Sequence, residues 1–580
     1  MTNAILMGKL NAGRSHVRFD EGDVASTKPR RGSLLYKSLA VTVKALALGA
    51  AMVGFAYGAQ AATWYVTPNA LDDGAGTSWA APISLAGAIN TATGGTAETE
   101  GDEILLKAGD YTLTAAISTS KALTIRGGYA GEGTTLDATN PYSVLSGGQA
   151  LEIAVTLTVA QDLTTKLERV VIRDAKATGL EKTGAGTLSM ADCRIEANGF
   201  MDFKGTRYGC GAYFESGVLT MTNCAFRGNV IYNKAGNLVY GAGIYLKNLK
   251  RAYLDDCSFV TNGMPTACYG SGGAAQETFK GAAIYATASP VTFRGCSFVG
   301  NRGAVHAGRG SEATGGIVHL DGNCNGSAFT NCVWKGNVMY CGGGSPGAGT
   351  TGMLVINGSA VTTALDVDSC TFAYNIVDAT ISPAALNVYK GAAKVRNSIF
   401  YGNILHKATS FGADLHVTAN GSADVDTCVF ASATVDNITY ASANALTMGP
   451  DNVFGDPKFV TDLATFAQNV NGGISGSTRS VNTENCLYIM KTADVCAYDL
   501  HLRSTKGHWT PNGFVADDEV SPMIGRGVNA GTDQASIRPN GTPALGTVEV
   551  AQADDSRLVN FTIPLAGTDD YIARVKLRFG

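Results

Sequence analysis

The stretches TLSMADCRIEAN (187–198) and VTFRGCSFVGN (291–301) contain the same short pattern, which recurs through the middle of the chain. A cysteine, replaced once by serine, marks each copy, and successive copies are 28 to 39 residues apart. The marker residues are Cys193, Cys224, Cys257, Cys296, Cys332, Cys370, Ser398 and Cys428. A repeat of this length indicates a fold that is built by stacking similar units.

Four other positions are shared by the copies. A large apolar residue lies three residues before the marker and another lies two residues after it, so apolar and small or polar residues alternate as in β-strands. The residue directly before the marker is small or turn-forming, as in Asp192, Asn223 and Gly295. Such residues tolerate a left-handed backbone conformation, so we expect a sharp bend there. Five residues after the marker stand Asn198, Asn229, Asn262, Asn301, Asn337, Asn375 and Asn403, and the last copy has Ala433.

A further strand opens each unit, as in GAYF (211–214), GAGIYL (241–246) and GAAIYA (281–286). Several short strands with bends between them predict an all-β fold, a single-stranded right-handed parallel β-helix solenoid. Coils separated by about 4.8 Å place like residues above one another, so the apolar columns form one core and the asparagines can hydrogen-bond from coil to coil. A leucine-rich repeat has a similar period, but its leucine and asparagine frame is missing.

The Phe-x-x-Asn words at 226–229 and 259–262, alternating with glycine-aliphatic words such as 241–244, resemble the repeats of chlamydial polymorphic outer-membrane proteins. More broadly, the chain is similar to secreted bacterial proteins with the pectin-lyase-like right-handed β-helix. The resemblance covers residues 62–550. Residues 63–92, 101–113 and 122–131 resemble an N-terminal cap and first coils, and residues 456–460, 498–509, 521–527 and 538–549 resemble final coils. The resemblance implies a fold and leaves the function open.

The two ends of the chain differ from the repeats. Residues 45–58 form an uncharged apolar run preceded by basic residues and followed by Ala59-Gln60-Ala61. This pattern predicts a signal peptide, residues 1–61, cut after Ala61. A membrane anchor is the alternative, but the run is shorter than the roughly 20 residues that a spanning helix needs. Residues 551–580 contain two strand-like stretches, which we expect to cap the last coil or to form a tail.

Charge and cysteine usage narrow the partners and the compartment. The chain has a net charge of −4, and residues 1–61 carry eight Lys or Arg against three acids, so the exported part is more acidic still. An acidic body without a basic cluster disfavours nucleic acid and anionic lipid as partners. We expect a monomer with no stable membrane span after cleavage. Among the cysteines outside the repeat, Cys486 and Cys496 are the better disulfide candidates, whereas Cys210, Cys268, Cys324 and Cys341 fall in loops.

Two sets of polar residues are candidates for chemistry. Asp366, Asp368, Asp424 and Asp426 fall on an outward face, as a calcium-dependent lyase would need, but Lys394 and Arg396 occupy the same positions in the coil between them. Opposite charges in adjacent coils favour surface pairing over a catalytic cluster. His319 and His416 lie on opening strands three coils apart, which is too far for one metal ion. We interpret both as exposed. The Asn-Thr-Asp and Gly-His-Gly words of polygalacturonases are absent from the sequence.

We therefore expect no catalytic, cofactor-binding or metal-binding residues. The predicted function is that of a non-catalytic protein of the exterior or cell surface, adhesin-like or in contact with extracellular carbohydrate, with a polysaccharide or a surface protein as partner. The alternative is a polysaccharide lyase or hydrolase with a diverged site, in which case Ca²⁺ could be the cofactor, held by the four aspartates.

Overall fold

The computed structural model describes residues 61–137, 139–199, 206–230, 238–263, 277–306, 314–342, 350–358, 364–378, 383–406, 413–433, 437–462, 498–505, 508–510, 513–523, 557–561 and 575–579. Residues 1–60 of the predicted signal peptide, Cys268, and the pair Cys486 and Cys496 lie outside these residues. Within the described part of the chain, no helix has the length and hydrophobicity that crossing a bilayer requires.

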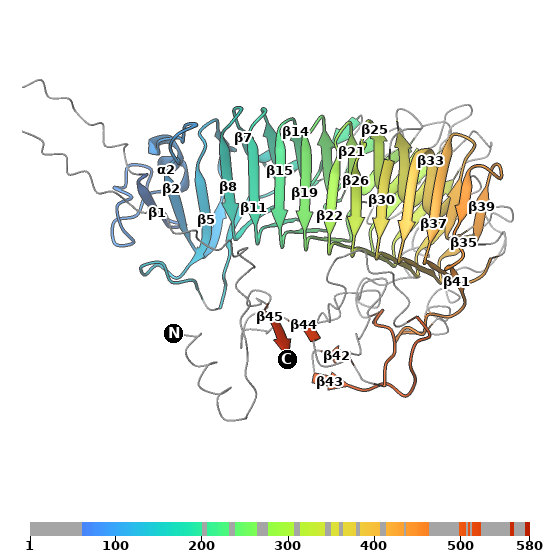
Figure 1. Ribbon diagram of the computed structural model, residues 1–580. Coiled ribbons are helices and arrows are strands. Elements are labelled where there is room, and N and C mark those ends of the chain that lie inside the picture. Colours follow the sequence, from blue (N-terminus) through green and yellow to red (C-terminus); the bar gives the residue numbers. More distant parts are fainter. Residues whose placement is uncertain are drawn as a thin grey trace, which may run out of the picture.

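Short parallel strands stack into an elongated body with three faces (Figure 1). The protein is a right-handed parallel β-helix. Each coil runs through an opening sheet, a middle sheet and a closing sheet, in that order, as in β21 to β22 to β23. The opening sheet contains β4 (Ile117–Thr119), β7 (Ile153–Thr158), β10 (Thr178–Thr183), β14 (Ala212–Glu215), β18 (Ile244–Lys247), β21 (Glu277–Thr287), β25 (Thr314–Gly322), β29 (Thr350–Gly358), β33 (Pro383–Arg396), β36 (Leu415–Val417) and β39 (Ile438–Tyr440).

The middle sheet begins with the first strand of the structure and shares β33 with the opening sheet. Its strands are β1 (Thr63–Val66), β2 (Glu103–Lys107), β5 (Thr124–Tyr129), β8 (Thr164–Glu168), β11 (Thr187–Ala191), β15 (Val218–Thr222), β19 (Arg251–Asp255), β22 (Val291–Arg294), β26 (Ser327–Thr330), β30 (Ala364–Asp368), β33, β37 (Gly421–Asp426) and β40 (Leu446–Met448). At the N-terminal end, the helix α2 (Leu85–Thr91) buries Leu85, Ala88 and Ile89 against the core, as expected of a cap (Figure 1).

The closing sheet carries the repeat marker just before each strand. Its strands are β3 (Gly109–Thr112), β6 (Ser143–Ser146), β9 (Val170–Arg173), β12 (Arg194–Glu196), β16 (Ala225–Arg227), β20 (Ser258–Val260), β23 (Ser297–Val299), β27 (Val333–Lys335), β31 (Thr371–Ala373), β34 (Ile399–Tyr401), β38 (Val429–Phe430) and β41 (Val453–Phe454). Further strands lie between the closing strand of one coil and the opening strand of the next: β13 (Thr206–Tyr208), β17 (Leu238–Tyr240), β24 (Arg302–His306), β28 (Val338–Gly342), β32 (Ile376–Asp378) and β35 (Ile404–His406).

The predicted bend between the middle and closing sheets is confirmed in all eight copies. The residue before each marker has a left-handed backbone, with φ between 49° and 62°, at Asp192, Asn223, Asp256, Gly295, Asn331, Ser369, Asn397 and Thr427. This conformation turns the chain through a corner within one residue, so the large residue on each side of the corner still faces inward. The marker side chain lies at the corner, fully buried.

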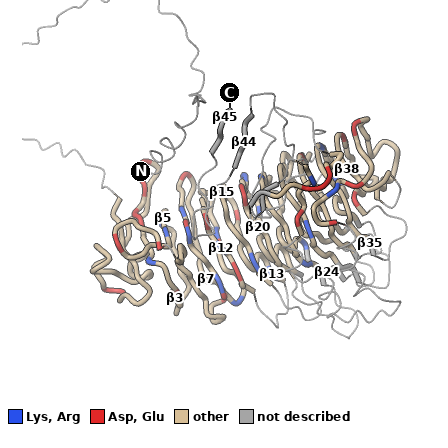
Figure 2. The backbone as a smooth tube through the Cα atoms, turned by 90° about the horizontal axis from the view of Figure 1, so that it is seen from below, with Lys and Arg blue, Asp and Glu red and all other residues tan. Residues whose placement is uncertain are grey.

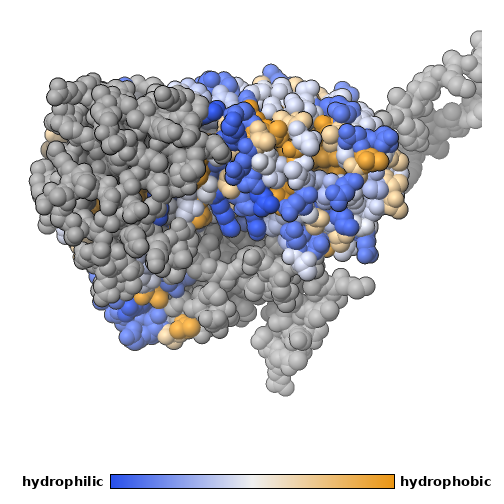
Figure 3. Space-filling view, turned by 180° about the vertical axis from the view of Figure 1, so that it is seen from behind, coloured by the Kyte–Doolittle hydropathy of each residue, from blue (hydrophilic) through white to orange (hydrophobic). Residues whose placement is uncertain are grey.

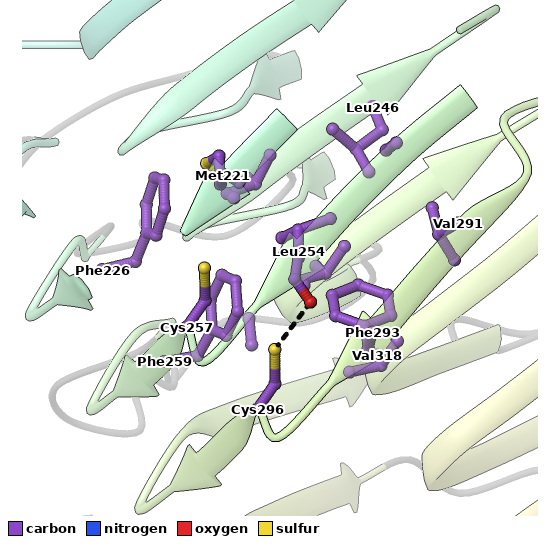
Figure 4. Packing of buried hydrophobic residues seen from close by; sticks show 14 of the residues in the cluster. Met221, Phe226, Leu246, Leu254, Cys257, Phe259, Val291, Phe293, Cys296 and Val318 are labelled. Carbon is purple, nitrogen blue, oxygen red and sulfur yellow. Dashed lines mark hydrogen bonds between the residues drawn. The ribbon is translucent and has the colours of Figure 1, made fainter. Parts of the chain in front are cut away.

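Like residues stack along the core, as the columns predict. Phe226, Phe259, Phe298, Trp334, Phe372, Phe400 and Phe430 form one aromatic column with successive ring centroids 4.3–5.2 Å apart. The marker thiols lie beside this column, and Figure 4 shows Cys296 Sγ donating to the carbonyl of Leu254 at 3.3 Å. The marker cysteines are free thiols and are buried. Cys210 and Cys324 lie outside the strands, as predicted, and are also buried.

The predicted asparagine ladder is present. Each asparagine from Asn198 to Asn375 donates from Nδ2 to the Oδ1 of the asparagine in the next coil, at 2.9–3.0 Å. The same Nδ2 group donates to a backbone carbonyl of the preceding coil at 2.8–3.1 Å. The side chains are fully buried up to Asn375. Because buried polar groups are costly when unpaired, this network penalises any slip in register between coils.

The ladder ends on a carboxyl group. Asn403 donates from Nδ2 to Asp414 Oδ1 at 2.8 Å, and Asn437 donates to Asp414 Oδ2 at 2.7 Å. A carboxylate accepts without donating, so it can receive both amides where the eighth copy has Ala433 in place of asparagine. Complete burial raises the pKa of Asp414 to about 6, against the opposing effect of the two hydrogen bonds.

The outer face of the closing sheet is covered by the C-terminal segment, here residues 456–462 and 498–505. Phe459 and Tyr498 pack on Tyr374 with ring centroids 6.1 and 5.7 Å away, and Lys335 Nζ donates to the carbonyl of Tyr498 at 2.8 Å. Residues 456–460 and 498–505, which were expected to form final coils, therefore lie on this face instead. Among the described residues, the last strand of the closing sheet is β41. At the chain's end, β44 (Arg557–Phe561) and β45 (Val575–Phe579) pair with each other antiparallel, as do β42 (His508–Thr510) and β43 (Gly513–Val515).

Phe298→Ala tests the stacked core. Its ring lies between Phe259 and Trp334, so we expect a loss of about 3–5 kcal/mol in unfolding free energy. Hydrogen exchange should accelerate mainly in residues 257–337, since each coil contacts only its neighbours. Phe454→Ala, at the partly exposed end of the same column, is the control and should cost much less. Uniform acceleration along the whole chain would contradict the stacked account.

The buried Asp414 carboxyl group should make the unfolding free energy depend on pH. Its folded-state pKa is about 6, above that of the unfolded chain, so the folded state binds more protons between about pH 4 and 6. The unfolding free energy should therefore fall as pH rises through this window, by up to about 3 kcal/mol. Denaturant titrations at several pH values should show that this fall in unfolding free energy disappears in Asp414→Asn and persists in the exposed control Asp366→Asn. An unchanged profile in Asp414→Asn would contradict the assignment.

Candidate functional site

A column of tyrosines lies on the outer face of the opening sheet. The register pairs Glu181 with Tyr213, Tyr213 with Tyr245, Tyr245 with Tyr285, and Tyr285 with His319. Side chains alternate along a strand. Because Phe214 and Leu246 are fully buried in the core, their neighbours Tyr213 and Tyr245 point outward.

A second column of tyrosines lies beside the first. Tyr208 on β13 and Tyr240 on β17 are paired in register and come five residues before Tyr213 and Tyr245. Gly209 and Gly241 turn the chain between the two columns with φ of 59° and 65°. A Cβ atom at Gly241 would lie 2.0 Å from the carbonyl oxygen of Ile244, so glycine is required there.

The two columns form one aromatic surface, which we call the tyrosine cluster: Tyr208, Tyr213, Tyr240, Tyr245 and Tyr285. The Tyr208 ring is stacked on those of Tyr240 and Tyr245, at 5.4 and 5.3 Å between centroids. The Tyr285 ring lies 5.1 Å from Tyr240 and 5.2 Å from Tyr245. Mutual contact fixes the rings and reduces the conformational entropy that they would lose on binding a ligand.

Exposure falls along the cluster. Tyr208 is 47% exposed, whereas Tyr245 and Tyr285 are 6% and 5% exposed. Every ring contact of Tyr208 is with a tyrosine of its own coil or of the next, and β13 is the first described strand of its ladder. Tyr208 is the most exposed member of the cluster, and we call its end of the cluster the open end. Figure 3, seen from behind, shows hydrophobic and hydrophilic residues interspersed on the described part of this side of the molecule.

Hydrogen-bonding groups flank the open end of the cluster. Tyr213 donates its hydroxyl to Glu215 at 2.6 Å, and Lys247 pairs with Glu215 at 2.9 Å. These two contacts lower the pKa of Glu215. Burial, and then the negative charge of Glu215, raise the pKa of Glu181. The two carboxyl groups thus differ in proton affinity although they lie on neighbouring strands.

The other end of the cluster is enclosed. The Tyr285 hydroxyl donates to Asp321 Oδ2 at 2.5 Å, Asn357 donates to Asp321 Oδ1 at 3.1 Å, and Lys280 lies 3.7 Å from the same carboxylate. Burial, followed by the charge of Asp321, raises the pKa of Tyr285. This end is a closed polar network that fixes the last tyrosine ring.

His319 and His416 are buried, and the expectation that they are exposed is wrong. His319 has no exposed surface, and burial lowers its pKa to about 3. Neither of its ring nitrogens has a hydrogen-bond partner among the described residues. His416 Nδ1 lies 2.8 Å from Thr439 Oγ1, and burial lowers its pKa to about 4. Both face outward on their strands but are covered, which alternation alone cannot reveal.

The aspartates that the sequence singled out lie on the middle sheet, away from the tyrosine cluster. The register places Lys394 between Asp366 and Asp424, and Arg396 between Asp368 and Asp426. Arg396 pairs with Asp424 at 2.6 Å, and Asn397 donates to Asp368 at 2.8 Å. The predicted surface charge pairing is confirmed for Arg396 and Asp424. Within the described ranges, no group of three or more His, Cys, Asp or Glu residues is arranged to hold a metal ion.

Several solved structures are similar to this chain. A pectate lyase, Pel9A, is 13% identical over 80% of this chain and 94% of its own, with a TM-score of 0.36. A rhamnogalacturonan lyase is 11% identical over 74% and 98%, with a TM-score of 0.30. The tailspike gp49 of Acinetobacter baumannii bacteriophage Fri1, a capsular polysaccharide depolymerase, is 12% identical over 66% and 62%, with a TM-score of 0.26.

These likenesses concern the fold alone, and the fold assignment rests on this chain's own strand register. No family model matches the chain, and no curated protein matches it in sequence. The resemblance of its repeats to chlamydial outer-membrane proteins remains a resemblance between short words. Any function must therefore be argued from the residues of the site.

Proposed function

We propose that this protein is exported and binds extracellular polysaccharide through the tyrosine cluster, without cleaving it. The observation that carries the proposal is the exposure of Tyr208 at the end of a stack of tyrosine rings that are already in contact. The C–H groups on one face of a sugar ring are attracted to the electron-rich face of an aromatic ring. A cleft or face that combines aromatic surface with a few placed polar groups is the usual form of such a site.

The polar groups near Tyr208 complement this role. Glu181 lies one strand before Tyr213, and Glu215 lies two residues after it. Their carboxyl oxygens can accept hydrogen bonds from sugar hydroxyls. Because Tyr245 and Tyr285 are almost fully buried, a polysaccharide would contact the cluster at its Tyr208 end.

Export is supported by the predicted signal peptide of residues 1–61, with its apolar run and its small-residue cleavage site. Outside the cell, a rigid solenoid can present one long face to a polymer.

Cleavage is the second candidate function, and one observation favours it. The pKa of Glu181 is raised while that of Glu215 is lowered. A general acid needs the first property, and a general base or nucleophile needs the second. However, Glu215 already pairs with Lys247 and accepts from Tyr213, so it has fewer sites left for a substrate or water.

Tyr208→Ala tests the proposal. We expect at least a tenfold loss of affinity for a polysaccharide that binds the native protein, about 1.4 kcal/mol, measured by calorimetry. Tyr208→Phe should retain most of the affinity, because the ring face remains. Tyr253→Ala is the matched control, since Tyr253 is 42% exposed but lies on the middle sheet.

Equal affinity of the Tyr208→Ala variant and the native protein would contradict the proposed site. A parallel assay for new reducing ends or unsaturated uronides decides between binding and cleavage. We expect no products; products that disappear in Glu181→Gln would establish the enzymatic alternative.

A further inference from the structure

The charges around the tyrosine cluster are paired with one another. Lys176 lies 2.9 Å and Arg207 3.6 Å from Glu152, at the edge of the opening sheet. Lys247 pairs with Glu215, and Lys280 with Asp321. Each of these four cations thus has an acidic partner on the same face. Figure 2 shows the same interspersion of both signs over the described coils.

Glu181 is the exception. Among the described residues it has no ion-pair partner, and its register neighbour is Tyr213 rather than a cation. The adjacent Lys182 cannot neutralise it, because Lys182 faces inward and is 1% exposed. The Lys182 ammonium donates to the carbonyls of Gly184, Gly186 and Ser216 at 2.6–2.9 Å. Among the residues that the structure describes, the open end of the cluster therefore carries a carboxyl group without a cation paired to it.

This arrangement bears on the class of ligand. Proteins that bind carboxylate-bearing polymers place arginine or lysine against each carboxylate, since an unpaired charge is costly to desolvate. A uronic-acid residue stacked on Tyr208 would find the nearby cations already engaged and would approach Glu181, a like charge. An uncharged sugar meets neither obstacle, and its hydroxyls can donate to Glu181 and Glu215.

We infer that the tyrosine cluster selects neutral polysaccharides and rejects uronic-acid polymers. The inference rests on the proposed function of this face and specifies the class of its ligand. Its recognition elements are the Tyr208 ring for the sugar face and the Glu181 carboxyl group for the hydroxyls. Since no net charge is neutralised on binding, the affinity should depend little on ionic strength.

The test compares two sets of probes with the purified protein. The neutral probes are galactomannan, xyloglucan and mixed-linkage β-glucan, and the acidic probes are polygalacturonate and alginate. Affinity electrophoresis should show retardation by at least one neutral polymer and at least tenfold weaker retardation by the acidic ones. The dissociation constant for the neutral polymer should change less than twofold between 50 and 500 mM NaCl. Glu181→Gln should reduce the difference in retardation between the neutral and the acidic polymers.

The outcomes separate the two proposals. Binding of polygalacturonate or alginate that equals or exceeds neutral binding, is lost in Tyr208→Ala and weakens with salt would overturn the inference while leaving the binding face intact. Retardation that is the same in Tyr208→Ala as in the native protein would overturn the binding face itself, as would the absence of retardation by every polymer. Tyr253→Ala again serves as the control for folding.

Discussion

The register between coils depends on a hydrogen-bonded column of buried asparagine side chains. Each amide in the column is paired on both sides, so displacing one coil by a single residue would leave amides unpaired in a dry interior. That cost is about 1–3 kcal/mol for each unsatisfied group. The left-handed corner next to the marker residue works with the column, because it returns the chain to the same place in each coil. Aromatic stacking then follows from the register that these two features impose.

A fixed register makes each outer face a set of columns with its own chemistry. The middle sheet carries alternating charges, as between Asp366, Lys394 and Asp424. The closing sheet changes along its length: Arg227 points outward in one coil, and Val260 and Val299 take that position in the next two. From there on, the apolar outward positions are covered by the C-terminal segment. The opening sheet carries the tyrosines, so the tyrosine cluster exists only because the coils are in register.

Much of this could be predicted from the sequence, because a solenoid converts sequence period directly into spatial columns. The apolar columns, the corners and the asparagine ladder are all readable in this way. The tyrosine column was also visible, as the Tyr of GAYF, GAGIYL and GAAIYA. It was not predicted as a site, because only acids and histidines were considered as candidate site residues. The burial of His319 could not be predicted, because alternation shows which way a side chain points and not what covers it. The path of residues 456–462 was also hidden, since its packing partners lie many coils away in sequence.

The most direct test of this account is hydrogen exchange on an Asn229→Ala variant. Asn229 donates to Asn262 and to the carbonyl of Ile195, and so joins the coil of Tyr213 to its neighbours. If the ladder holds the register, exchange should accelerate in β14 through β20, with protection retained in β31 through β38, and polysaccharide binding at Tyr208 should weaken. Unchanged exchange in residues 211–263 would show that the asparagine column does not set the register.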